Sequence, residues 1–165
     1  MATKSNFTAD EWSRVLASPM VVGTAISAAD PSGLWGLMKE GMAGGWALVK
    51  SKQDVNTNEL IKAVAEDYAN GEARTLARDR VQTIFKGSAA ANMKDRAVEE
   101  LRSLSTLLQS KAPEDAPAFK DWLREIAQKA AEAATEGGFL GFGGVSVSDA
   151  EKATLSEISA ALSKA

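Results

Sequence analysis

The sequence predicts an all-α protein, a compact single domain over residues 1–165 with six to eight helices in a bundle. Apolar residues recur at helical spacing through most of the chain, and helix-start patterns precede many of these stretches. No stretch of useful length alternates between apolar and polar residues, as a half-buried strand would. A hydrophobic fraction of 45% and a charged fraction of 25% are typical of a soluble globular domain.

The first predicted helix starts where Thr8 and Glu11 have the spacing of a capping box. Pro19 is expected to end or kink this helix at Ser18, because proline has no N–H to donate and disfavours the helical conformation of the residue before it. A second apolar segment, 20–29, follows.

The next predicted helix covers 31–51, with Asp30 as its N-cap and Pro31 at its first position. Its interior glycines weaken it and indicate close packing against another helix, which is the favoured interpretation. The alternative is a groove for a ligand or partner, lined by Trp35 and Trp46.

Five further helices complete the prediction. One of them is basic, but its acidic residues favour a solvated face over a phosphate site. The first of the five starts at Glu59 and stops at Asn70–Gly71. The second, the basic helix, covers 74–86 and carries Arg74, Arg78, Arg80 and Lys86. The other three cover 89–111, Phe119 to near Gly137, and about 149–163.

A glycine-rich stretch, 137–145, carries large apolar side chains, which a flexible linker would lack. Glycines allow close backbone approach, so we expect Phe139, Leu140 and Phe142 to pack as a plug. If Phe139 and Phe142 face the helix with the two tryptophans, the four rings would line an apolar groove. Ser148, just beyond this stretch, begins a second capping box.

Two segments of the chain echo each other, 28–37 and 133–142. Gly33 and Gly138 occupy matching places in them, and apolar residues follow at matching offsets. The echo is either chance in a chain rich in alanine and glycine or a duplicated helix–turn–helix unit. Duplication predicts pseudo-repeated halves around 9–51 and 114–163.

Three stretches of the C-terminal part carry a family resemblance: Ala-Glu-Ala-Ala-Thr-Glu-Gly at 131–137, Val-Ser-Val-Ser-Asp-Ala-Glu at 145–151 and Leu-Ser-Glu-Ile-Ser-Ala-Ala-Leu at 155–162. Together they resemble the tellurite-resistance TerB family. The chain also resembles uncharacterised bacterial helical proteins that share the Gly-Gly-Phe-Leu-Gly-Phe-Gly-Gly stretch. The TerB resemblance implies an all-helical fold of two related halves, candidate cation sites at acidic turns, and a role in tellurite or chemical stress through binding. The chain departs from the family pattern at Glu136, where an aspartate is usual.

Three acids around the second turn, Glu136, Asp149 and Glu151, are the candidate metal ligands. The favoured alternative for Asp149 and Glu151 is capping chemistry at the start of the last helix. The acid pairs Glu99–Glu100 and Glu114–Asp115 are interpreted as a solvated face and a turn.

Composition narrows the function classes. The chain has no histidine and no cysteine, which removes common general bases, nucleophile pairs and zinc sites. A net charge of −3 argues against nucleic acid as the partner. The apolar stretch at 15–29 is too short for stable membrane insertion, and the N-terminus has no secretory pattern.

These features predict a cytoplasmic, non-enzymatic bacterial protein without a cofactor that acts by binding. Its partner would be another protein, with a homodimer included, or a small apolar ligand. The alternative function is a small-molecule or lipid carrier with an apolar cavity lined by the tryptophan and phenylalanine side chains.

Overall fold

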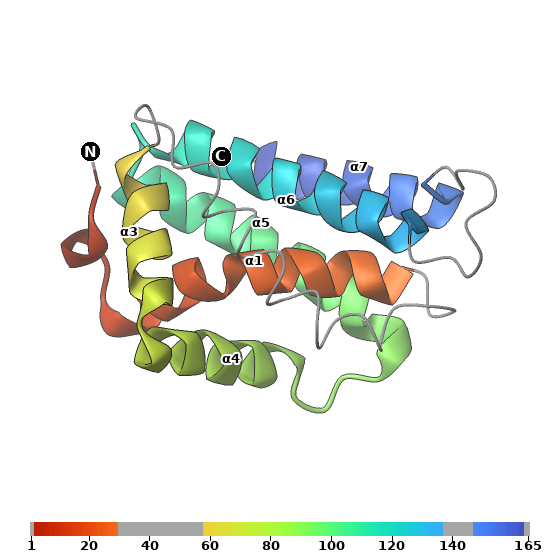
Figure 1. Cartoon of the computed structure of the whole chain (residues 1–165), viewed down its shortest axis with the longest axis horizontal. Helices are drawn as coiled ribbons and strands as arrows, with labels where there is room; N and C mark the ends of the chain where they lie inside the picture. The colour runs from red at the N-terminus through yellow and green to blue at the C-terminus, as the bar shows by residue number, and fades with distance from the viewer. Residues whose placement is uncertain (1, 30–57, 137–146, 164–165) are drawn as a thin grey trace.

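The computed structural model describes residues 2–29, 58–136 and 147–163 (Figure 1). No strand occurs among these residues, and the all-α class with six to eight helices is confirmed. The predicted helix over 31–51, the glycine-rich stretch and the internal repeat depend on residues outside this description. The helices are α1 (Ala9–Ala29), α3 (Glu59–Ala69), α4 (Gly71–Phe85), α5 (Met93–Lys111), α6 (Ala116–Glu136) and α7 (Asp149–Ser163), with short 3₁₀-helices at Lys4–Asn6 and Ala90–Asn92.

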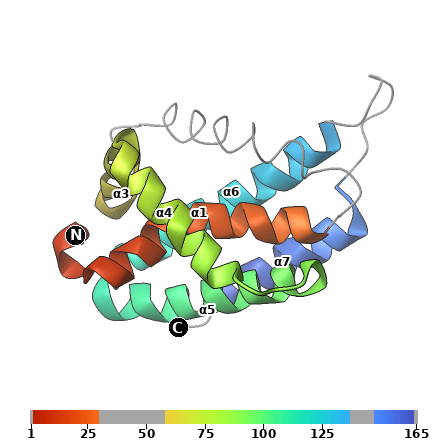
Figure 2. The same ribbon diagram turned by 90° about the horizontal axis from the view of Figure 1, so that it is seen from below.

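Helix α1 is the centre of the bundle and contacts α3, α4, α5, α6 and α7. In Figure 1 it crosses the middle of the molecule, with α4 below it and α6 and α7 above it. The turned view in Figure 2 shows α5 and α7 running together along another side of α1. Since other helices cover α1 on several sides, its sequence has to be apolar around most of its circumference.

The composition of α1 meets this requirement. From Val15 to Ala29 the helix has no charged residue, and most of its side chains are buried. Its buried hydroxyl groups donate to carbonyl oxygens of the same helix: Ser13 Oγ to Asp10 at 2.7 Å and Thr24 Oγ1 to Met20 at 2.8 Å. These bonds remove the desolvation cost that an unpaired buried hydroxyl would carry.

The helix was predicted to end or kink at Pro19, and the predicted end is wrong, because α1 continues through this residue. In a regular helix the N–H of residue 19 would donate to the carbonyl of Val15, and proline has no N–H. Ser18 Oγ donates to that same carbonyl, at 2.7 Å, and both Ser18 and Pro19 are buried. The hydroxyl thus replaces the missing backbone donor, and packing on the surrounding helices retains the helical path.

Both predicted capping boxes are confirmed. The Thr8 N–H donates to Glu11 Oε2 at 2.8 Å, and the Glu11 N–H donates to Thr8 Oγ1 at 3.3 Å. At the start of α7 the same pair of bonds joins Ser148 and Glu151, at 2.8 and 3.2 Å. Each box satisfies two backbone donors that a helix start would otherwise leave without partners.

A single asparagine forms the corner between α3 and α4. Asn70 was predicted as a stop, and it is the C-cap of α3. It is also the N-cap of α4, since its side chain accepts from the Glu72 N–H at 3.0 Å. Helix α4 therefore begins at Gly71, about one turn earlier than predicted.

Candidate functional site

The predicted apolar groove cannot be placed, because Trp35, Trp46, Phe139 and Phe142 all lie outside the described residues. The side chain of Glu136, at the end of α6, also lies outside them. The remaining candidates for a site are the acids of α7, the acid pairs and the basic helix.

The two described metal candidates do not converge. Glu151 is buried, and its Oε2 accepts from the N–H and the Oγ of Ser148, so its carboxylate is used in the capping box. Asp149 is fully exposed and lies 3.7 Å from Lys152 Nζ. Within 2–29, 58–136 and 147–163, no group of three acids is placed to hold a metal ion.

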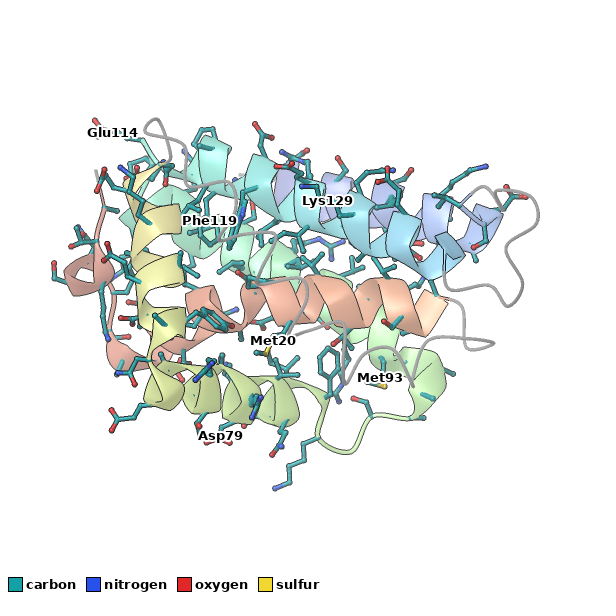
Figure 3. The ribbon with its side chains drawn as sticks, viewed as in Figure 1. Met20, Asp79, Met93, Glu114, Phe119 and Lys129 are labelled. Carbon is teal, nitrogen blue, oxygen red and sulfur yellow. The ribbon has the colours of Figure 1, made fainter. Side chains whose placement is uncertain are left out.

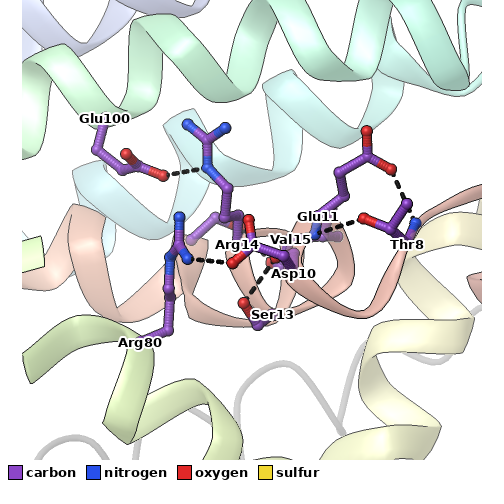
Figure 4. Close-up of polar contacts among 9 residues, drawn as sticks. Thr8, Asp10, Glu11, Ser13, Arg14, Val15, Arg80 and Glu100 are labelled. Atoms are coloured by element: carbon purple, nitrogen blue, oxygen red, sulfur yellow. Dashed lines mark hydrogen bonds and ion pairs between the residues drawn. The ribbon is translucent and has the colours of Figure 1, made fainter. Parts of the chain in front are cut away.

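One acid of each pair is built into the bundle. Glu100 Oε1 of α5 lies 2.7 Å from Arg14 Nε of α1, with both side chains largely buried (Figure 4). Asp115 lies in a turn, as the sequence predicted, but its side chain is buried. It is 5% exposed and accepts hydrogen bonds from the Ala2 N–H and, at 2.8 Å, from Asn58 Nδ2. It joins the N-terminal segment, the start of α3 and the start of α6.

The basic side chains of helix α4 point in two directions: one points toward α1, and the others are exposed. Arg80 points toward α1, where its Nη1 lies 2.6 Å from Asp10 Oδ1 (Figure 4). It is therefore unavailable to a phosphate group. Arg74, Arg78 and Lys86 are exposed and have no ion pair with any described residue.

The buried side chains on the inner face of α4 are small. Its fully buried positions are Ala73 and Ala77, while Val81, Ile84 and Phe85 are half-buried. The outer surface carries an open hollow of about 600 Å³ at the α3–α4 corner. We call this feature the α4 hollow; its lining residues are Asn70, Gly71, Glu72, Thr75, Leu76 and Asp79.

Leu76 distinguishes the α4 hollow from the rest of the described surface. It is 42% exposed, and no other large hydrophobic side chain among the described residues is exposed. Glu72 and Asp79, one turn to either side on the helix, are exposed carboxylates without a described ion-pair partner. Figure 3 shows Asp79 on the side of α4 that faces away from α1. The hollow thus combines an apolar side chain with two free negative charges.

The sequence analysis did not single out Leu76 or the acids beside it as a site. The spacing contained the correct information, since Leu76 lies four residues after Glu72 and three before Asp79. Residues with these separations share one helix face. An aliphatic residue between two acids on one face indicates an outward position.

Side chains in the last turn of α3 hold the α3–α4 corner, where the α4 hollow lies, against α1. Trp12 Nε1 donates to Asp67 Oδ2 at 2.7 Å, and Lys4 Nζ lies 2.9 Å from the same oxygen. The buried Tyr68 hydroxyl donates to the Leu16 carbonyl, and burial raises the pKa of Tyr68 well above its usual value. These bonds fix Asn70, two residues further on, and with it the first turn of α4.

Comparison with family models, with curated proteins and with solved structures finds no match to this chain. Among the described residues, no helix combines the length and the apolar character needed to cross a membrane.

Proposed function

We propose that this chain is a non-enzymatic helical binding module and that the α4 hollow is its docking surface for another protein. The observation that carries the proposal is the exposure of Leu76 between two carboxylates that have no ion pair with any described residue. Aliphatic side chains exposed singly are common on protein surfaces. Here the side chain lies in a hollow of about 600 Å³ with complementary polar groups on both sides, which are the elements of a small recognition site.

The chemistry of the hollow defines the partner. Leu76 offers apolar area that gains free energy when a partner covers it. Glu72 and Asp79 favour a lysine or arginine at the rim, where charge mainly sets orientation and the rate of association. The partner we propose is a protein segment that presents an apolar side chain next to a basic one.

Site-specific photo-crosslinking tests the proposal. A photoreactive amino acid is placed at position 76, and the matched control carries it at Thr106, an exposed position on α5. Irradiation in bacterial cells that express the chain should give a discrete adduct from position 76 only. The mass of the adduct separates a second copy of the chain from a different protein.

Charge reversal sharpens the test. Asp79→Lys should weaken the adduct because it replaces an attractive charge by a repulsive one. Glu99→Lys, at an exposed acid on α5, should leave it unchanged. Equal adducts from positions 76 and 106, or an adduct insensitive to Asp79→Lys, would show that the hollow is not a docking surface.

The TerB-like role in tellurite or chemical stress is part of the same proposal. It predicts that expression of the chain raises the tellurite tolerance of a sensitive bacterial host. A Leu76→Asp variant, with its circular dichroism unchanged, should lose this effect if tolerance depends on docking. Identical growth with and without the chain would remove the stress role while leaving the crosslinking result untouched.

A further inference from the structure

Lys120 on α6 is a lysine in an uncommon setting. Its side chain is 7% exposed, and its amine has no hydrogen bond or ion pair with any described residue. The other described lysines are paired with carboxylates, except Lys86, which is exposed. Lys120 is therefore the described lysine that lacks both a negative partner and full hydration.

The position of Lys120 follows from its neighbour one turn later. Arg124 Nη2 donates to Ser163 Oγ at 3.0 Å, which places this side of α6 against the C-terminal end of α7. Arg124 Nη1 also lies 2.5 Å from Asp121 Oδ1, so its own charge is partly compensated. Lys120, at the preceding turn on the same side, faces the region where α7 ends.

The amine is not sealed in the core. Among the described residues, the side-chain atoms that are fully enclosed and lack a partner are Arg80 Nε and Ser88 Oγ. Lys120 Nζ is not one of them, so the buried stem brings the nitrogen to the edge of solvent.

An ammonium group that has lost most of its water and has no partner is destabilised, and the destabilisation disappears when the group releases its proton. Burial lowers the pKa of Lys120, and the positive charge of Arg124 lowers it further. Desolvation and a neighbouring cation are the two devices that make a lysine nucleophilic in proteins that form Schiff bases.

We propose that Lys120, with Arg124 beside it, is a reactive amine that binds small aldehydes covalently as a Schiff base. The neutral nitrogen attacks the carbonyl carbon, and the resulting carbinolamine loses water to form the C=N bond. No oxidant or reductant takes part, and water reverses the reaction. The low exposure of the side chain restricts the site to aldehydes of a few carbon atoms.

Reductive trapping tests this. The folded protein is treated with limiting acetaldehyde and cyanoborohydride, which reduces the C=N bond to a secondary amine, and mass spectrometry locates the added ethyl groups. Lys120 should be modified several-fold more than Lys86, the matched lysine that also lacks a partner but is exposed. Lys94, which donates a hydrogen bond to Glu157 that raises its pKa, should react least.

The same reaction in urea provides the reference. In the unfolded chain the lysines share one environment, so the preference for Lys120 should vanish. Arg124→Gln should reduce the preference in the folded protein, and Ser163→Ala, which removes the Arg124 contact without changing charge, should retain it. The proposal is overturned if folded Lys120 reacts no faster than Lys86, or if Arg124→Gln leaves the preference unchanged.

Discussion

Helices α1 and α4 lie against each other in the bundle, yet they differ in how much of their side-chain surface they bury. Helix α1 is buried along most of its length and has no charged residue after Arg14. Helix α4 buries two alanines fully and exposes Leu76 between two acids. The contrast indicates that α1 carries much of the stability of the bundle, while the proposed docking surface lies on the outer side of α4.

Truncating a core leucine of α1 should have the largest effect. Leu16 is fully buried, so Leu16→Ala removes contacts with the covering helices and leaves a cavity. We expect a loss of about 2–5 kcal/mol in the free energy of unfolding, measured by urea denaturation. A loss below about 1 kcal/mol would mean that α1 is not the centre of a packed core.

Ser18→Ala should cost about 1–3 kcal/mol, because it leaves the buried Val15 carbonyl without its donor. Pro19→Ala restores a backbone N–H that can bond to the same carbonyl. A double-mutant cycle by urea unfolding should therefore show that Ser18→Ala costs less in the Pro19→Ala background. Additive costs would contradict the assignment of the serine hydroxyl as the replacement donor.

Tyr68 should make the protein sensitive to alkali. Its folded-state pKa is raised by burial, whereas an unfolded tyrosine titrates near pH 10. The unfolded chain therefore loses this proton first, so the stabilising contribution is intact below about pH 10 and falls as pH rises further. The slope is about 1.4 kcal/mol per pH unit.

Urea unfolding of wild type and Tyr68→Phe between about pH 8 and 11 measures this term. The difference between the two proteins cancels the titration of lysines and isolates the hydroxyl. We expect the wild-type curve to fall more steeply above pH 10. Parallel curves would show that Tyr68 ionises as easily in the folded protein as in the unfolded chain.

Leu76→Ala should have the smallest effect on stability, within about 0.5 kcal/mol, because the side chain is largely outside the packed interior. The same variant should weaken the proposed docking. Compared with Leu16→Ala, it separates the role of the core helix from that of the recognition surface. A loss as large as that of Leu16→Ala would place Leu76 in the core.

Local patterns were sufficient to predict the all-α class, both capping boxes and the end of α3 at Asn70. Each depends on residues within four positions, and the interactions involved are formed within one helical turn. The predicted end at Pro19 was wrong because the proline rule assumes that no side chain replaces the missing donor. The adjacent serine replaces that donor, and α1 continues past the proline.

Features with distant partners could not be predicted in this way. Asp115 was interpreted as part of a turn, but its carboxylate binds Ala2 and Asn58, which are remote in sequence. Nothing in the local pattern around Asp115 specifies either partner. The exposure of Leu76 depends on which face of α4 meets α1, and alanines at positions 73 and 77 occupy that inner face.

The place of α1 in the chain has a consequence for biosynthesis. Helix α1 ends at Ala29, and the last helix that covers it ends at Ser163, so about 130 residues separate the two. At about 5–20 residues per second, the ribosome needs on the order of ten seconds to supply the complete cover. During that time the nascent chain exposes α1, the most apolar of the described helices. We therefore expect newly made chains to depend on a holding chaperone that the finished protein no longer needs.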